Sequence, residues 1–272
     1  MEPISTDGRA FLQRVRRATV ASGALALWYI GGAGYIARTT GATLLIDPFL
    51  GPSNPPDWMR AIPPAFAPDD LDALGSVDAV LITHEHSDHA DPVALAAIAA
   101  LPEIPVLGTP AAIEVATRAG LDAGRAIVFP PESSRPIGDL TVTAAPMHDP
   151  TAQSANGYLL ETGETTLLLC GDSLYFSGFL EIGRRWALDA ICLTVGANPP
   201  GMTVYMGESD VARATRDSGA ASVIVQHYDL WQGLTLDPER VRTVCRWYAP
   251  DTKVIPARFQ RRITLAPGGA SR

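Results

Sequence analysis

The ten residues from Val80 to His89, VLITHEHSDH, constrain this chain more than any other stretch. A short apolar run ends at Thr83, and three imidazoles and one carboxylate follow within six positions: His84, His86, Asp88 and His89. The chain has five histidines, and three of them lie here. Packing does not explain such a concentration. The simpler alternative is a polar surface loop with a solvated histidine cluster.

The flanking residues place this cluster between a strand and a helix. Asp91 and Pro92 open an alanine-rich stretch, and an acid at the cap followed by proline is a helix-start signal. In an extended segment, side chains two positions apart face the same side. Imidazole and carboxylate groups are ligands for zinc, manganese or iron. Four of them on one loop exceed what a single tetrahedral ion with an open position takes from one segment, which suggests two ions.

Length and charge narrow the class of protein. The 272 residues are 47% hydrophobic and 18% charged, which predicts one domain (1–272) with a sizeable core. The net charge is −8, and no basic run is longer than a pair of residues. Nucleic acid is therefore not an expected partner, because phosphate binding favours a basic stripe.

Cysteine spacing and hydropathy indicate the compartment. Cys170, Cys192 and Cys245 show no CxxC spacing and each lies in or beside an apolar segment, so we expect buried free thiols. No stretch of eighteen unbroken apolar residues is present, so no integral membrane association is expected. We expect a cytoplasmic protein, whose residues 1–22 form an N-terminal amphipathic helical segment rather than a signal peptide.

The order of elements predicts an α/β protein. A glycine-marked hairpin comes first, strand and helix patterns then alternate in two similar halves, and residues 267–272 are expected to fray. This order suggests two mixed sheets packed face to face with helices outside. Strands are expected near 25–30, 35–38, 42–46, 80–82, 106–108, 127–129, 140–145, 157–161, 166–170, 189–195, 221–226, 253–255 and 263–265, and helices at 8–20, 92–101, 110–119, 178–186, 208–218 and 237–248.

Three further polar residues follow predicted strands. They are His148, Asp172 and His227, and with them every histidine of the chain lies at or just past a strand end. Loops at strand ends are where a rigid scaffold carries functional groups. His148 or His227 taken alone would fit a satisfied core histidine, but with the 84–89 loop no histidine is left over.

The set HxHxDH, then His148, then Asp172 within GDS, then His227, resembles the metallo-β-lactamase superfamily, from Trp28 to about Trp247. Within it, GGAGYIARTTGATLLIDPFL, CGDSLYFSGFLEIGRRWALDAICLTVGANPPGM and QHYDLW are similar to ascorbate-6-phosphate lactonase-like and N-acyl-phosphatidylethanolamine phospholipase D-like proteins. The resemblance implies the metallo-β-lactamase fold, a four-layer αββα sandwich of two mixed β-sheets.

The resemblance also implies how the ligands divide between two divalent ions. The implied sets are His84, His86 and His148 for the first ion, and Asp88, His89 and His227 for the second, with Asp172 bridging both. Zinc and manganese are expected first, and iron suits the same donors. Asp47 is not expected to bind a metal itself but to accept an N–H from one of the ligand histidines. The alternative for Asp47 is an acidic turn residue before proline.

Such a centre indicates hydrolysis. Two ions roughly 3.5–4 Å apart can share a metal-bridging hydroxide that attacks a lactone, ester, amide or phosphodiester of a small molecule. Asp172 would hold both ions, and Asp88 or a metal-bound water could pass a proton to the leaving group. The alternative class is an iron-dependent oxidoreductase on the same fold. A nuclease is disfavoured because the net charge of −8 would repel a nucleic-acid backbone.

Two long loops, 49–70 and 196–207, flank the ligands in sequence. Together with residues just after His227, they supply the candidate substrate-binding residues, which are Trp58, Arg60, Tyr205, Tyr228 and Trp231. For the aromatic residues, ordinary loop packing is the alternative, and for Arg60 a plain surface charge. The sequence leaves open the substrate, the metal, whether the chain forms a homo-oligomer, and whether these loops form a lid.

Overall fold

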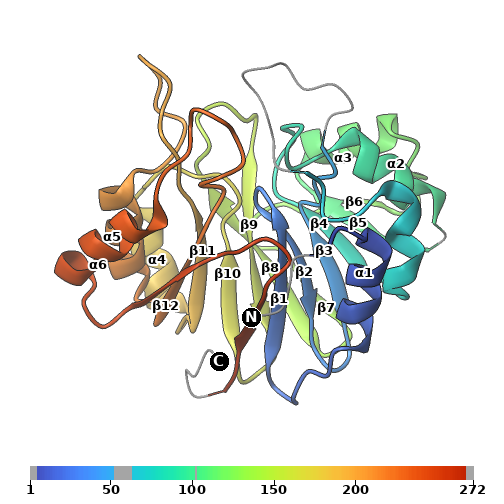
Figure 1. The fold of residues 1–272 in the computed structure, drawn as a ribbon, viewed down its shortest axis with the longest axis horizontal. Coiled ribbons are helices and arrows are strands. Elements are labelled where there is room, and N and C mark those ends of the chain that lie inside the picture. The colour runs from blue at the N-terminus through green and yellow to red at the C-terminus, as the bar shows by residue number, and fades with distance from the viewer. Residues whose placement is uncertain (1–4, 52–62, 102, 268–272) are drawn as a thin grey trace.

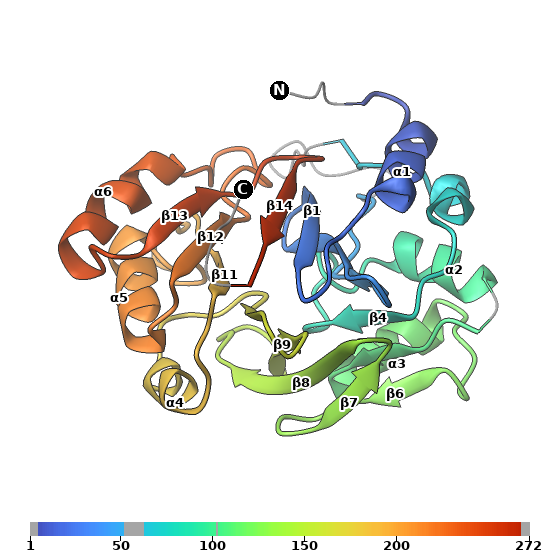
Figure 2. The same cartoon turned by 90° about the horizontal axis from the view of Figure 1, so that it is seen from below.

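The computed structural model describes residues 5–51, 63–101 and 103–267. Two seven-stranded sheets pack against each other, and helices cover their outer faces (Figures 1 and 2). The strand order is β14-β1-β2-β3-β4-β5-β6 in the first sheet and β13-β12-β11-β10-β9-β8-β7 in the second. This is the four-layer αββα arrangement expected from the sequence.

The first sheet comes mainly from the N-terminal half. Its strands are β1 (Leu25–Gly31), β2 (Gly34–Arg38), β3 (Thr43–Ile46), β4 (Ala79–Ile82), β5 (Val106–Gly108), β6 (Ala126–Val128) and β14 (Arg262–Leu265). Strands β14 to β3 pair antiparallel, and β3 to β6 pair parallel. The change to parallel pairing at β3 brings the C-terminal ends of β3 and β4 together at one edge.

The second sheet comes from the C-terminal half. Its strands are β7 (Ser134–Ile137), β8 (Leu140–Met147), β9 (Ala155–Glu161), β10 (Thr166–Leu169), β11 (Ala190–Thr194), β12 (Ser222–Gln226) and β13 (Lys253–Pro256). Strands β7 to β10 pair antiparallel and β10 to β13 pair parallel. Strands β8, β10 and β12 therefore run in the same direction and end at the same edge.

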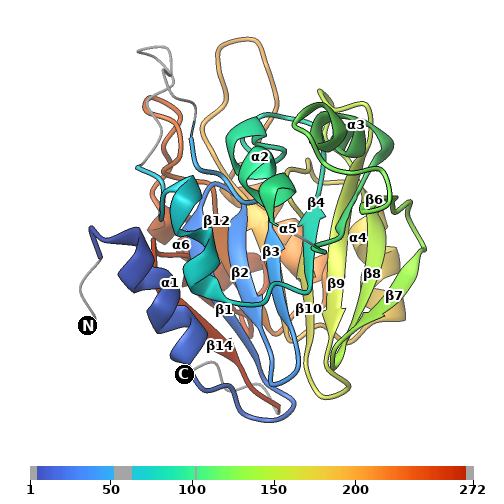
Figure 3. The same cartoon turned by 90° about the vertical axis from the view of Figure 1, so that its right-hand side faces the viewer.

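Helices on the outer face of each sheet form the outer layers (Figure 3). Helices α1 (Gly8–Arg17), α2 (Pro92–Ala100) and α3 (Pro110–Arg118), with the 3₁₀ helix η2 (Pro68–Leu74), cover the first sheet; α4 (Gly178–Arg185), α5 (Glu208–Ser218) and α6 (Pro238–Tyr248) cover the second. Helices α2, α3 and α6 begin alike, with proline first and a capping side chain before it. At α2 the cap is Asp91, which accepts from the Val93 N–H.

Alternation along the strands builds the layers. In β1, Leu25, Leu27 and Tyr29 enter the core between the sheets, while Ala26 and Trp28 face the helices of the first outer layer. Successive strand residues point to opposite faces, so a strand covered on both faces is apolar throughout, as β1 is. All three cysteines are buried and free, as expected.

Some sequence expectations differ in detail. The first helix ends at Arg17, not Val20, and strand β7 was not expected. Strand β7 is a mostly exposed edge strand with a central proline, so it lacks the apolar alternation that marks a strand. Part of the 49–70 loop and most of the 267–272 tail lie outside the described residues. Within the described part of the chain, no helix is long and apolar enough to cross a membrane.

We predict that Leu27→Ala lowers the free energy of unfolding by about 3 kcal/mol, because it leaves a cavity in the fully buried layer between the sheets. Urea denaturation measures this. Trp247→Ala is the control, because that side chain is 84% exposed and its loss should cost less than about 0.5 kcal/mol. Equal effects of the two substitutions would contradict the assigned core.

Candidate metal centre

The centre begins where β3 and β4 end side by side. Asp47 follows β3 and Thr83 follows β4. The Thr83 N–H donates to Asp47 Oδ1 over 2.8 Å, and the Thr83 hydroxyl donates to Asp47 Oδ2 over 2.7 Å. Asp47 is fully buried, and its φ of 39° is unusual for a residue with a side chain. A buried carboxylate held in this way costs free energy unless each oxygen is satisfied.

This carboxylate sets which nitrogen two histidines present to the centre. His89 Nδ1 lies 2.8 Å from Asp47 Oδ2, so it carries a proton and donates. Thr83 Oγ1 gives its only proton to Asp47, so it accepts from His84 Nδ1 at 3.0 Å. Both histidines thereby turn Nε2 toward the centre, and Nε2 offers a lone pair whenever the imidazole is neutral. Such outer hydrogen bonds fix the orientation of metal-binding histidines.

Four buried side chains form what we term the inner group: Asp88, His89, Asp172 and His227. His227 Nε2 lies 3.1 Å from Asp88 Oδ2, and His89 Nε2 lies 3.4 Å from Asp172 Oδ2. The other two histidine–aspartate separations are 3.8 Å from His89 Nε2 to Asp88 Oδ2 and 3.9 Å from His227 Nε2 to Asp172 Oδ1. Strand ends from both sheets therefore converge here.

The inner group fits a cation. His89 Nε2 and Asp172 Oδ1 are buried, and neither has a hydrogen-bond partner among the described residues. Buried polar atoms are otherwise almost always paired, so such atoms call for a ligand. A divalent ion satisfies a lone pair and two carboxylates at once, and the donors suit zinc, manganese or iron.

The charges of the inner group are strongly coupled. Burial opposes the ionised form of Asp88, but His89 and His227 hold its pKa at about 2. Burial likewise opposes the ionised form of Asp172, but the charges of His227 and His89 outweigh burial and hold its pKa well below the usual value. Burial opposes protonation of His89, yet the charges of Asp172, Asp88 and Asp47 raise its pKa well above the usual value. The His227 pKa is also raised, chiefly by Asp172 against burial.

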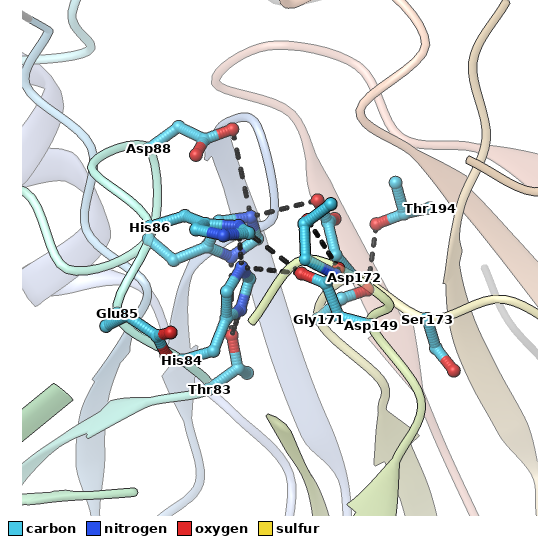
Figure 4. Close-up of polar contacts among 12 residues, drawn as sticks. Thr83, His84, Glu85, His86, Asp88, Asp149, Gly171, Asp172, Ser173 and Thr194 are labelled. Atoms are coloured by element: carbon cyan, nitrogen blue, oxygen red, sulfur yellow. Dashed lines mark hydrogen bonds and ion pairs between the residues drawn. The ribbon is translucent and has the colours of Figure 1, made fainter. Parts of the chain in front are cut away.

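A second set, the outer group, lies beside the first and consists of His84, His86 and Asp149. Figure 4 shows the Asp149 carboxylate facing the two imidazoles. The His84 ring centroid is 4.1 Å from that of His89, so the two groups are contiguous. Burial lowers the His84 pKa to about 3, which keeps this imidazole neutral and able to bind a metal.

The structure does not bring His148 into either group. The residue is exposed, its ring lies 6.4 Å from that of Phe176, and its main chain is bonded to Ser173 and Leu174. The neighbouring Asp149, which sequence reasoning missed, lies beside His84 and His86, where His148 was expected. The available signal was that Asp149, like Asp47, is an acid just past the end of a strand.

Gly171 allows the second sheet to approach the first. A Cβ atom there would lie 2.7 Å from Thr83 Oγ1, and the residue has a φ of 59°. Only glycine accommodates both the close approach and the left-handed backbone. Its carbonyl accepts from Thr194 Oγ1 over 2.8 Å, which holds the turn that carries Asp172.

His227 adopts a left-handed backbone, with a φ of 67°. Its N–H donates to the Tyr29 hydroxyl over 3.4 Å, and that hydroxyl donates to the Gly32 carbonyl over 3.0 Å. Backbone strain of this kind persists where surrounding contacts enforce it, commonly at functional sites. Tyr29 was not singled out from the sequence, because nothing marks a buried strand tyrosine as a support.

The expected substrate-binding residues divide into three cases. Tyr205 lies near the centre, with its ring 5.2 Å from that of His227, and Trp231 packs with Phe49. The Tyr228 hydroxyl donates to the Ala257 carbonyl over 2.7 Å, so it is committed elsewhere. Trp58 and Arg60, which were also expected, lie outside the described part of the chain.

The fold and this cluster define the class of protein. A family model described as the beta-lactamase superfamily domain matches residues 42–228, and the chain belongs to that family. Its architecture is the metallo-β-lactamase fold. A relative at the level of a particular protein is the probable L-ascorbate-6-phosphate lactonase UlaG of Escherichia coli O127:H6, which is 26% identical over 85% of this chain and 77% of the relative.

Solved structures agree on the fold. A possible metal-dependent hydrolase from Veillonella parvula superposes with a TM-score of 0.72 at 22% identity, covering 88% of this chain and 99% of that one. CmlA, a diiron beta-hydroxylase from Streptomyces venezuelae, superposes with a TM-score of 0.64 at 21% identity, covering 89% of this chain and 54% of that one. At these identities the likeness concerns the fold alone.

We predict that Thr83→Val weakens metal binding by about 10- to 100-fold, because His84 Nδ1 loses its acceptor and Asp47 loses a donor. Isothermal titration with Zn²⁺ or Mn²⁺ measures the affinity. Thr83→Ser keeps the hydroxyl and should bind within a few-fold of wild type. A valine variant with wild-type affinity would show that this hydroxyl does not orient the ligand.

Metal uptake should release protons. The charges of Asp172 and Asp88 raise the pKa values of His89 and His227 against burial, so the metal-free protein favours their protonated forms more than a free imidazole does, whereas ligation requires both to be neutral. We expect about one to two protons released per chain on saturation, and affinity that rises as pH rises from about 6 to 8. Titration in buffers of different ionisation enthalpy measures the release. A pH-independent affinity would contradict these protonation states.

Proposed function

We propose that this protein is a dinuclear metal-dependent hydrolase that opens a lactone, ester or phosphodiester of a small molecule. The observation that carries the proposal is the buried inner group, in which His89 Nε2 and Asp172 Oδ1 have no hydrogen-bond partner among the described residues. The adjoining outer group, 4.1 Å away between the His84 and His89 rings, supplies the donors for a second ion.

The bound pair of ions would supply an activated water nucleophile and withdraw charge from the substrate oxygen. The chain's own part is to position and to move protons. Asp47 and Thr83 bond His89 and His84 at Nδ1, so that Nε2 of each ring is turned toward the metal centre. Asp88 and Asp172 stay ionised at neutral pH, so they would retain the cations, and during the reaction Asp88 would take the proton of the attacking water and pass it to the leaving group.

The surroundings suit a substrate with a ring or acyl portion. Phe49, Leu230 and Trp231 form a buried apolar cluster, against which Tyr205 and Leu234 pack. Tyr205 connects this cluster to His227 through the 5.2 Å ring contact. The name of the lactonase relative supports a lactone as the first substrate to try, and a role for Arg60 in meeting a phosphate stays a prediction.

The test combines metal content with hydrolysis. Wild-type protein should hold about two ions per chain and should open members of a panel of sugar-acid lactones and aryl esters or phosphodiesters. Asp172→Ala and His84→Ala should each lower kcat/KM by at least about 1000-fold. The surface variant Trp247→Ala should match wild type.

Two outcomes would contradict the proposal. Metal-replete protein that is inert toward the whole panel would exclude the reaction class. Oxygen consumption by iron-loaded protein without hydrolysis would support the iron-dependent oxidoreductase instead.

A further inference from the structure

We infer that Asp149, and not His148, is the third protein ligand of the outer ion, so that this subsite consists of two imidazoles and one carboxylate. The inference rests on the proposed function, because it specifies the donor set of one of the two ions. Three independent observations carry it: the spacing of the donor atoms, the anchoring of the Asp149 carboxylate, and the anchoring of the chain around it.

The donor atoms have the spacing that a metal requires. His84 Nε2 lies 2.9 Å from His86 Nδ1, and Asp149 Oδ2 lies 3.3 Å from each of them. Three donors at about 2.1 Å from one ion stand about 3.0 Å apart in octahedral and about 3.4 Å apart in tetrahedral geometry. The observed triangle lies at or close to this range, without movement of the backbone.

The Asp149 side chain is built to present one oxygen. Its Oδ1 accepts two hydrogen bonds, from the Thr151 N–H at 2.9 Å and the Thr151 hydroxyl at 2.8 Å. This leaves Oδ2 turned toward the two imidazoles. The side chain is only 3% exposed, so its charge is shielded from water and requires a partner.

The main chain on either side is held in this orientation. The His148 N–H donates to Ser173 Oγ over 3.1 Å, and the His148 carbonyl accepts from the Leu174 N–H over 2.7 Å. The Gln153 N–H donates to Glu85 Oε1 over 2.7 Å, which ties the Asp149 loop to the loop of His84 and His86. Placing the His148 ring where the Asp149 carboxylate lies would require the main chain to rotate, and these bonds oppose that rotation.

A carboxylate at this position has a consequence for metal choice. Imidazoles suit zinc, iron and other transition metals, whereas carboxylate oxygen suits harder ions such as Mn²⁺. The centre would also carry three carboxylates, Asp88, Asp149 and Asp172, against its cations. We therefore expect the outer subsite to favour Mn²⁺ or Fe²⁺ relative to Zn²⁺ more than a three-histidine subsite would.

The test compares Asp149→Asn with His148→Ala, two substitutions at adjacent positions. Asparagine keeps the oxygen that accepts from Thr151 but replaces the ligating oxygen, so the loop should stay folded. Equilibrium dialysis with Mn²⁺ should give about two ions per chain for wild type and His148→Ala, and about one for Asp149→Asn. Electron paramagnetic resonance should show spin-coupled Mn²⁺ in the first two proteins and an isolated six-line signal in the third.

The outcomes separate the inference from the proposed function. Wild-type protein that takes up fewer than two ions contradicts the dinuclear centre and the inference with it. Wild-type protein that takes up two, with Asp149→Asn also taking up two, contradicts the inference alone. Loss of one ion in His148→Ala, with Asp149→Asn unaffected, restores the histidine as the ligand.

A third substitution tests metal choice. Asp149→His should lower the ratio of Mn²⁺ to Zn²⁺ affinity by about 10-fold or more, because a nitrogen donor replaces the oxygen. Competition titrations measure the ratio. An unchanged ratio would overturn the selectivity expected of the carboxylate.

Discussion

The buried carboxylate of Asp47 links the two halves of the centre. One oxygen accepts from the Thr83 main chain, and the other accepts from both the Thr83 hydroxyl and His89 Nδ1. Because that hydroxyl donates to Asp47, it accepts from His84, which therefore carries a proton on Nδ1. One group thus orients a histidine of the inner group and a histidine of the outer group. Without it, His89 Nδ1 and the Thr83 hydroxyl would lose their acceptor, and with it the contacts that keep both Nε2 atoms toward the centre.

This arrangement depends on the sandwich around it. Parallel pairing of β3 with β4 places Asp47 beside Thr83, and the second sheet delivers Asp149, Asp172 and His227 from the ends of β8, β10 and β12. The left-handed backbones of Asp47 and His227 lie at these ends, where close packing of both sheets enforces them. The apolar core between the sheets therefore supports the strained positions that the centre uses.

The sequence predicted the parts of the centre that a local pattern marks. The 84–89 loop follows a continuous apolar strand, and Asp172 and His227 each follow another, so their positions at one edge could be expected. That Asp149 and not His148 lies beside His84 and His86 could not be predicted, because the local pattern does not show how bonds to Ser173 and Leu174, far along the chain, hold the main chain there. Strand β7 was missed for a related reason, since its pairing with β8, and not its own pattern, makes it a strand.

The most direct test of the account is anomalous X-ray scattering from crystals of the Mn²⁺-loaded protein. The account predicts two peaks, one enclosed by Asp88, His89, Asp172 and His227, and one enclosed by His84, His86 and Asp149. A single peak, or a second peak that contacts His148 instead of Asp149, would contradict it.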